Sequence, residues 1–462
     1  MRRTALPRRY RFPACAGTVF SALSGAFLSA VLATAVTTIG SAAAAAADPA
    51  GAGFSPERLA RIDGHMAAAV EAGTMVGGEG LIARGGKIVY HETWGERDRE
   101  AQLPATTATL YRIYSMTKPI TTVAVLMLYE EGRFLLGDPV AKYLPELGDL
   151  TVAESLDPNA PLTTRPPVRQ PTIRDLLRHS AGFSYGLFGD TSVDRAYRDA
   201  GLLQQEDLAA FTATLGRLPL QYEPGTRWHY SVAVDVQGRL IEALSGMTLG
   251  DFLRERIFEP LGMTDTHFVV PADKRERLAQ LYSPKGTTMA WDAPWQFNDE
   301  QTLEVADPEL TRGYLEGNVF ESGGGGLVST ARDYLRFAQM LAGDGEVDGV
   351  RLLAPLTVRH LRRNHVAGLA TDDLYSIDGF GLGVGVSIDP GVTGELGADG
   401  SYGWGGAAGT LFWVDPVDDI VGIFMTQSVP HQTTLADSFR VLTYQALLET
   451  RRDRVGGACA AF

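Results

Sequence analysis

Residues 115–129 read SMTKPITTVAVLMLY. From Ile120 onward, apolar side chains fall on nearly every side of a helical repeat, which is typical of a helix surrounded by protein. Pro119 suits the first turn of such a helix, because the backbone N–H has no intrahelical partner there. Ser115 and Lys118 are three residues apart and therefore lie on nearly the same face. The stretch predicts a buried helix whose first turn brings an amine to a hydroxyl.

The chain is poor in lysine, with five lysines against thirty-six arginines. Arginine keeps its proton in proteins, whereas a buried lysine can lose one. Burial and the positive end of the helix dipole both lower the pKa of Lys118, which favours its neutral, basic form. The pair therefore predicts a base beside a nucleophilic serine. The alternative is an ordinary helix-capping Ser115 followed by an ordinary lysine.

A second candidate is Tyr230, in the segment 223–232, which reads EPGTRWHYSV. The turn at Pro224-Gly225 brings Tyr230 to the start of the next predicted helix. A phenol there could take the serine proton and pass it to the leaving group, with Lys118 holding the pKa of the phenol down. The alternative is a tyrosine that only packs in the core. With the Trp404-Gly405-Gly406 segment, these residues predict a serine acyl-hydrolase.

The three segments resemble the three motifs of the class C β-lactamase and penicillin-binding superfamily, in the form found in family VIII carboxylesterases. The resemblance extends to framework segments and covers most of residues 55–450. It implies an α/β (α+β) serine β-lactamase-like fold, in which an antiparallel sheet is flanked by helices and a helical lobe is inserted. The framework segments that carry it are 173–182 (IRDLLRHSAG), 260–266 (PLGMTDT) and 323–333 (GGGGLVSTARD).

The same resemblance implies a role for each site residue. Ser115 is the expected nucleophile, and Lys118 and Tyr230 are the expected base pair. The backbone N–H groups of Ser115 and Ala407 are expected to form the oxyanion hole. Trp404 is expected to line the acyl or alcohol pocket.

Two departures from the β-lactamase pattern bear on the substrate. Val232 stands where those enzymes place an asparagine, and Trp404 stands where they place lysine or histidine. Both changes remove polar groups that a lactam or peptide would use. We therefore expect Trp404, Gly405, Gly406 and Val232 to bind small neutral carboxylic esters. The alternatives are a β-lactamase, a D-alanyl-D-alanine carboxypeptidase or aminopeptidase, an acyltransferase, or a sensor that acylates once.

The order of the elements predicts a sheet built from both ends of the chain. One hairpin is expected across Gly85-Gly86 and another between residues 410–414 and 420–425, with mostly helical sequence between them. The expected boundaries are 1–47 for a signal peptide, 48–450 for the catalytic domain, about 48–110 and 320–450 for its sheet lobe, about 111–319 for its helical lobe, and 451–462 for a flexible tail.

Residues 1–47 are expected to direct export to the periplasm or the medium. Five arginines precede an apolar stretch from Ala14 to Gly40, and an alanine run follows it. Twin-arginine export at Arg8-Arg9 and an uncleaved membrane anchor are the alternatives considered. Cleavage would change the net charge from -14 to -19, because the segment holds five arginines and no acidic residue.

The remaining acidic surface would repel phosphate backbones, so we expect no nucleic-acid partner. The histidines show no metal-ligand spacing, and a single cysteine would remain, so we expect no metal and no other cofactor. After cleavage we also expect no stable insertion into a membrane. The expected partner is a small-molecule ester.

One motif points elsewhere. Residues 182–186 read GFSYG and fit the G-x-S-x-G elbow of α/β-hydrolases. That elbow requires a strand ahead of it. Ile173, Leu176 and Leu177 have helical spacing instead, so Ser184 is not the expected nucleophile. Gly323 to Gly326 is expected to let backbone approach the site closely, or to form a turn.

Overall fold

The computed structural model describes residues 48–287, 289–296, 301–317, 320–371, 378–431, 433–451 and 453. The described residues form one compact unit. The expected signal peptide and most of the expected tail lie outside the described residues. No helix in the described part of the chain is both long and apolar enough to cross a bilayer.

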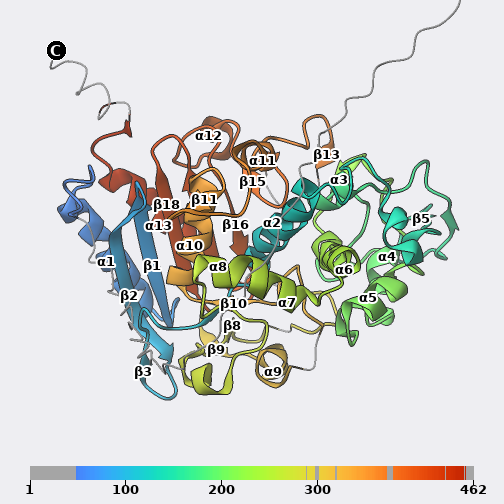
Figure 1. The fold of residues 1–462 in the computed structure, drawn as a ribbon. Coiled ribbons are helices and arrows are strands. Elements are labelled where there is room, and N and C mark those ends of the chain that lie inside the picture. The colour runs from blue at the N-terminus through green and yellow to red at the C-terminus, as the bar shows by residue number, and fades with distance from the viewer. Residues whose placement is uncertain are drawn as a thin grey trace, which may run out of the picture. The chain divides into compact units, whose positions relative to one another are not determined.

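An eight-stranded antiparallel sheet combines strands from the N-terminal and C-terminal parts of the described chain (Figure 1). β1 pairs with β18, so that Leu81 faces Ile423 across strands far apart in sequence. This arrangement confirms the sheet predicted from the two hairpins. In sheet order the strands are β14 (Gly379–Phe380), β15 (Gly385–Val386), β16 (Tyr402–Gly406), β17 (Thr410–Asp415), β18 (Ile420–Thr426), β1 (Gly77–Arg84), β2 (Lys87–Asp98) and β3 (Leu103–Pro104).

The first hairpin turns at Gly85 and Gly86, whose φ angles are 58° and 76°. Both values lie in the left-handed region that glycine adopts without a steric penalty, as a two-residue turn of this kind requires. Arg84 consequently pairs with Lys87 directly across the turn. The second predicted hairpin is also present, with Asp415 of β17 paired to Ile420 of β18.

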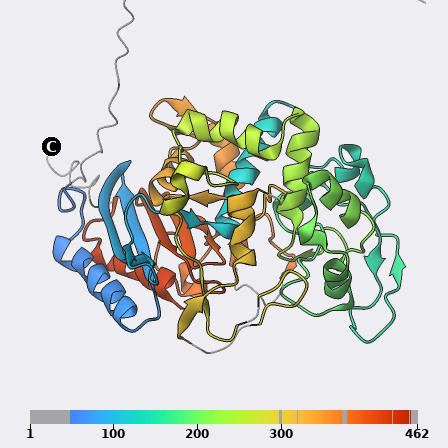
Figure 2. The ribbon, with the colours of Figure 1, turned by 90° about the horizontal axis from the view of Figure 1, so that it is seen from below.

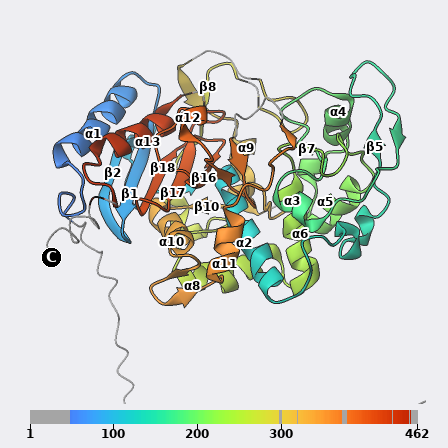
Figure 3. The same cartoon turned by 90° about the horizontal axis from the view of Figure 1, so that it is seen from above.

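Helices cover both faces of the sheet. α1 (Pro56–Glu71) and α13 (Leu435–Ala446) lie on one side of the strands, and α10 (Ala331–Ala342) lies on the other (Figure 3). Ser55 caps α1, because its side chain accepts a hydrogen bond from the Arg58 N–H. Phe439 of α13 packs against aromatic rings of the strands.

The central part of the chain is helical, and its helices gather beside the sheet (Figure 2). α2 (Thr117–Glu130) is the link between the two parts. Every residue from Thr117 to Leu128 is buried, which confirms the all-round burial predicted for this helix. α6 (Ala233–Ser245) and α7 (Leu249–Leu253) pack against α2, and α3 (Ile173–Leu177) and α5 (Leu208–Leu215) pack in turn against α6. The helical part also contains α4 (Ser192–Asp199).

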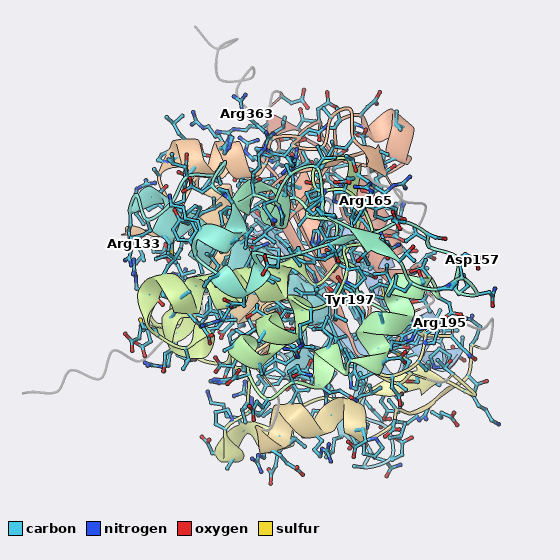
Figure 4. The ribbon with its side chains drawn as sticks, turned by 90° about the vertical axis from the view of Figure 1, so that its right-hand side faces the viewer. Arg133, Asp157, Arg165, Arg195, Tyr197 and Arg363 are labelled. Carbon is cyan, nitrogen blue, oxygen red and sulfur yellow. The ribbon has the colours of Figure 1, made fainter. Side chains whose placement is uncertain are left out.

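The proline-rich segment 157–171 runs along the surface. Asp157 and Arg165 are exposed and project outward, whereas Tyr197 of α4 lies inside (Figure 4). The remaining elements are β4 (Tyr111–Arg112), β5 (Val152–Ala153), β6 (Thr164–Arg165), β7 (Arg227–Trp228), α8 (Glu259–Leu261), β8 (Tyr282–Pro284), β9 (Leu303–Val305), α9 (Glu309–Glu316), β10 (Val328–Ser329), β11 (Glu346–Val347), β12 (Val350–Arg351), α11 (Pro355–Leu361), β13 (Ala370–Thr371) and α12 (Pro390–Thr393).

Part of the segment expected in the helical lobe contacts the sheet side instead. Tyr282 of β8 forms a bridge with Ser428, just after β18, and the Gln280 N–H donates to the Arg97 carbonyl of β2. These bridges join residues far apart in sequence, so the local apolar pattern does not indicate them.

Gly422 is a glycine of the sheet whose replacement should be costly. Gly422 of β18 pairs with Trp413 of β17, and a Cβ at this position would overlap the buried Trp413 ring. We expect Gly422→Ala to lower the free energy of unfolding by about 1–3 kcal/mol. Gly64 is the control, because a Cβ there meets nothing within 4 Å and the residue lies inside α1. Gly64→Ala should stabilise by about 0.5–1 kcal/mol. Chemical denaturation measures both, and equal effects would contradict the packing described.

Candidate active site

Ser115 lies at a sharp turn between β4 and α2. The turn is a single 3-10 segment, Tyr114–Met116, and Tyr114 has a φ of 42°. This left-handed conformation is unusual for a residue with a side chain and is common where backbone is constrained near a site. The sequence predicted that Ser115 opens the helix, but α2 begins at Thr117. Ser115 is therefore presented from the turn that precedes the helix.

Lys118 brings its amine to Ser115, as the three-residue spacing predicted. The side chain is 1% exposed. Its Nζ lies 3.1 Å from Ser115 Oγ, 2.9 Å from Tyr185 Oη and 2.6 Å from the Gly324 carbonyl oxygen. Burial lowers the pKa of Lys118 to about 7, and the negative charge of Asp235 opposes this shift. The amine can therefore exist in its basic form near neutral pH.

The glycine run after residue 322 forms the wall behind this amine. The Gly324 N–H donates to Asp235 Oδ1 at 3.0 Å, and Ser322 Oγ donates to the same oxygen at 2.6 Å. A Cβ on Gly324 would lie 2.7 Å from Asp235 Oδ2 and 3.0 Å from Tyr185 Oη. Only glycine leaves room for this contact, so the close backbone approach predicted for residues 323–326 is present.

Tyr230 lies on the other side of the amine. Lys118 Nζ is 4.6 Å from the centre of its ring, and the Trp404 indole N–H donates to its Oη at 3.3 Å. Burial raises the pKa of Tyr230 despite hydrogen bonds with Ser115 and Trp404 that lower it. The expectation that Lys118 holds this pKa down is therefore wrong, because burial outweighs the other effects. A raised pKa favours the neutral phenol of Tyr230, and the role of Lys118 as the base stays a prediction.

The third motif reaches the site along β16. Gly406 passes so close to the Ile113 carbonyl and to Thr410 Oγ1 that a Cβ would overlap both. This contact holds the end of β16 against the turn that carries Ser115. Ala407 follows directly, and its carbonyl accepts the His431 N–H at 3.1 Å. Ser115 and Ala407 line the same cavity, and their joint role as an oxyanion hole stays a prediction.

Val232 is placed differently from the other expected substrate contacts. Trp404, Gly405 and Gly406 line the cavity in front of Ser115. Val232 does not, because it is 0% exposed and packs in the core at the start of α6. Its side chain can influence a substrate only through the residues that it supports.

The G-x-S-x-G hypothesis for Ser184 is excluded by its surroundings. The preceding element is the helix α3, as predicted, and not a strand. Ser184 is 2% exposed, and its hydroxyl donates to Asp194 Oδ1. The neighbouring Tyr185 does reach the site, and the sequence analysis missed it. Tyr185 directly follows Ser184 in the G-x-S-x-G sequence, so that motif was the one local feature that drew attention to this segment.

The site opens into a cavity of about 970 Å³. Its wall is rich in aromatic rings, and the Arg312 side chain is the one lysine or arginine among the described residues that line it. Arg312 is itself paired with Glu309 at 2.8 Å. The aromatic lining residues are Tyr114, Tyr185, Phe188, Tyr230, Phe268, Trp291, Trp295, Tyr314, Phe320 and Trp404.

Comparison with known proteins agrees with this geometry. The family model described as Beta-lactamase matches residues 62–445, which is most of the chain. The chain belongs to the beta-lactamase family. Its Ser-Lys-Tyr cluster is that of a serine hydrolase of this family, with the α/β fold and antiparallel sheet that the resemblance implied.

Esterases are among the relatives of this beta-lactamase-family protein. Esterase EstB of Burkholderia gladioli is 32% identical over 384 residues, which cover 80% of this chain and 91% of EstB. A putative D-alanyl-D-alanine carboxypeptidase of Escherichia coli K12 is 30% identical over 402 residues, which cover 83% of this chain and 85% of that protein. The structure of EstCE1, titled a hydrolase with promiscuous acyltransferase activity, superposes with a TM-score of 0.69 at 25% identity, covering 84% of this chain and 99% of EstCE1. The predicted family VIII esterase-like character is thereby confirmed.

The depressed pKa of Lys118 predicts a particular pH profile. Only the neutral amine can accept a proton, so kcat/KM for an uncharged ester should rise from acid pH and level off above about 7.

A substitution at Lys118 tests the same role. Lys118→Arg keeps the positive charge but cannot act as a base, so kcat should fall by orders of magnitude with a modest change in KM. Steady-state kinetics on nitrophenyl acetate checks both. Near-full kcat in Lys118→Arg would show that another group activates Ser115.

Proposed function

We propose that this protein is a serine carboxylesterase that cleaves small neutral esters through an acyl-enzyme on Ser115. The observation that carries the proposal is the Ser115–Lys118–Tyr230 cluster facing an aromatic cavity in which the third motif supplies Trp404 instead of a cation. EstB and EstCE1, an esterase and a hydrolase among its relatives, support the same assignment.

In the first half-reaction, Ser115 Oγ bonds to the ester carbonyl carbon and its proton passes to Lys118 Nζ. The oxygen of the tetrahedral intermediate is stabilised by the expected N–H groups of Ser115 and Ala407. Collapse of the intermediate breaks the carbon–oxygen bond to the alcohol. Tyr230 donates its proton to the departing alkoxide and regains one from the Lys118 ammonium.

In the second half-reaction, water attacks the acyl-enzyme. Its proton passes to the neutral Lys118 amine, and a hydroxide equivalent bonds to the acyl carbon. Ser115 Oγ then leaves and recovers a proton from Lys118, so that a carboxylic acid is released and the free enzyme is restored.

The charge of the cavity supports an uncharged substrate. A lactam or peptide substrate carries a carboxylate, and a site that binds it needs a cation. Among the described lining residues, Arg312 alone has a guanidinium or ammonium group, and Glu309 already pairs with it. An uncharged ester needs no such partner and gains from the aromatic wall.

A second candidate function is acyl transfer to an alcohol in place of water. EstCE1 is described as having promiscuous acyltransferase activity. An apolar cavity favours an alcohol over water as the second substrate, because the alcohol buries apolar surface there.

We also propose that residues 1–47 direct export of the enzyme, because five arginines precede an apolar stretch and an alanine run follows it.

The choice of nucleophile can be tested with two serine variants. Ser115→Ala should abolish turnover of nitrophenyl acetate, because it removes the atom that forms the acyl-enzyme. Ser184→Ala should keep a substantial fraction of kcat and lose only about 1–3 kcal/mol of stability, because the Ser184 hydroxyl bonds Asp194 and not the site. Kinetics and thermal unfolding of both variants provide the measurement. If Ser184→Ala has no turnover of nitrophenyl acetate while Ser115→Ala keeps it, the assignment of Ser115 as the nucleophile is wrong.

Selectivity can be tested at Trp404. Trp404→Lys restores a cation but removes an apolar wall, so ester kcat/KM should fall about ten-fold or more, while cephalosporin turnover falls less or rises. Trp404→Phe is the matched control, since it keeps a ring but lacks the indole N–H that bonds Tyr230. Its ratio of ester to lactam activity should stay close to that of the wild type. An unchanged ratio in Trp404→Lys would show that the residue does not contact the substrate.

A further inference from the structure

The amine of Lys118 has three acceptor atoms around it but, when neutral, only two hydrogens and one lone pair. The Gly324 carbonyl, at 2.6 Å, can only accept, so one N–H is committed to it. The second N–H and the lone pair are then divided between Ser115 Oγ at 3.1 Å and Tyr185 Oη at 2.9 Å. Each hydroxyl can either donate or accept, so two arrangements exist.

The two arrangements differ in chemistry. If Tyr185 accepts the second N–H, the lone pair faces Ser115 and can take its proton. If Tyr185 donates to the lone pair instead, the amine donates to Ser115 and cannot act as its base. The direction of the hydrogen bond between Lys118 and Tyr185 therefore decides whether Ser115 is activated.

We propose that Tyr185 is a positioning residue whose phenol oxygen accepts from the Lys118 amine and thereby directs the lone pair onto the Ser115 hydroxyl. The inference rests on the proposed role of Ser115 as nucleophile. Its geometric basis is the placement of Tyr185 Oη, which is fixed by packing of its ring 5.3 Å from Phe188 and 5.5 Å from Tyr230. The same ring lines the substrate cavity.

The arrangement also suits the step that follows. When Ser115 Oγ attacks, its O–H bond breaks, the Oγ–carbon bond forms, the carbonyl electron pair moves to oxygen, and a third N–H forms on Lys118. The resulting ammonium has one hydrogen for each of its three acceptors. Tyr185 and Gly324 accept before and after the transfer, so no polar group has to reorient.

Several titratable groups face the amine from the elements packed against it. His179 and Tyr185 come from the segment after α3, Tyr230 precedes α6, and Asp235 lies in α6. Burial keeps the pKa of His179 well below its ordinary value, so this histidine stays neutral. The negative charge of Asp235 favours the ammonium. A phenol oxygen that accepts from Lys118 also favours the ammonium, so its removal should lower the pKa of Lys118.

The test compares the wild type with Tyr185→Phe and Tyr185→Leu, which both lack the phenol oxygen. The rate of covalent labelling of Ser115 by a fluorophosphonate probe is measured from about pH 5 to about pH 9, together with kcat and KM for nitrophenyl acetate. Both variants should label roughly ten-fold or more slowly at the plateau, with a larger effect on kcat than on KM. The acidic limb of the labelling rate should move to lower pH.

Tyr197→Phe is the matched control. Tyr197 is 1% exposed, lies beside Gly186 and donates to the Pro219 carbonyl at 3.2 Å, but it does not reach Lys118. Removal of the Tyr197 phenol oxygen should leave the acidic limb of the labelling rate at its wild-type pH. Thermal unfolding identifies any variant that is slow because it is not folded, and the inference can be judged on either Tyr185 variant that folds.

Two results would overturn the proposal. If the Tyr185 variants label at the wild-type plateau rate and the acidic limb of their labelling rate does not move, Tyr185 only lines the cavity. If the variants have a lower plateau rate but the acidic limb does not move, Tyr185 has a structural role without influence on the pKa of Lys118. Failure of the proposed function looks different, because the wild-type enzyme would then be labelled by the fluorophosphonate and yet turn over no ester.

Discussion

Lys118 places a primary amine where solvent does not reach, and the rest of the site depends on satisfying it. An amine without hydrogen-bond partners in such surroundings would be strongly destabilising. Its acceptors come from segments far apart in the sequence: the turn at Ser115, the loop at Tyr185 and the glycine run at Gly324. Burial of the same amine lowers its pKa to about 7. One constraint therefore joins the two parts of the protein and also lowers the pKa of the group that we propose as the base.

Meeting that constraint requires backbone to approach the site from two directions. Gly324 lies against Asp235 and Tyr185, and Gly406 lies against the Ile113 carbonyl, so neither position has room for a side chain. Asp235 accepts the Gly324 N–H, and the Gly324 carbonyl accepts a hydrogen bond from the Lys118 amine. The glycines are thus required by close packing around Ser115 and Lys118.

Trp404 links the chemistry of the cluster to the choice of substrate. Its indole N–H bonds the Tyr230 phenol, while its ring packs edge-on against Phe380 and lines the cavity. In the β-lactamase pattern that the three motifs resemble, a lysine or histidine occupies the position of Trp404. The change therefore supports Tyr230 and removes an attraction for carboxylates at the same time.

The sequence by itself determined the features that depend on short separations along the chain. The three-residue spacing of Ser115 and Lys118 predicted that the amine meets the hydroxyl, which holds although Ser115 lies in the turn before the helix, and the Gly85-Gly86 pair predicted the hairpin turn. Motif resemblance added Tyr230, Trp404 and the family fold, and the helical pattern ahead of Ser184 correctly argued against the elbow.

Only the tertiary structure decided how distant segments share the buried amine. Tyr185 and Gly324 are separated from Lys118 by 67 and 206 residues, and no local pattern indicates which side chain or carbonyl will face it. Burial also decided that the pKa of Tyr230 rises and that Val232 lies in the core, because both depend on the surrounding packing and not on the residue alone. The spacing of Ser115 and Lys118 placed a serine beside a lysine, and the packing of the helical and sheet parts around them set the pKa of each group in the cluster.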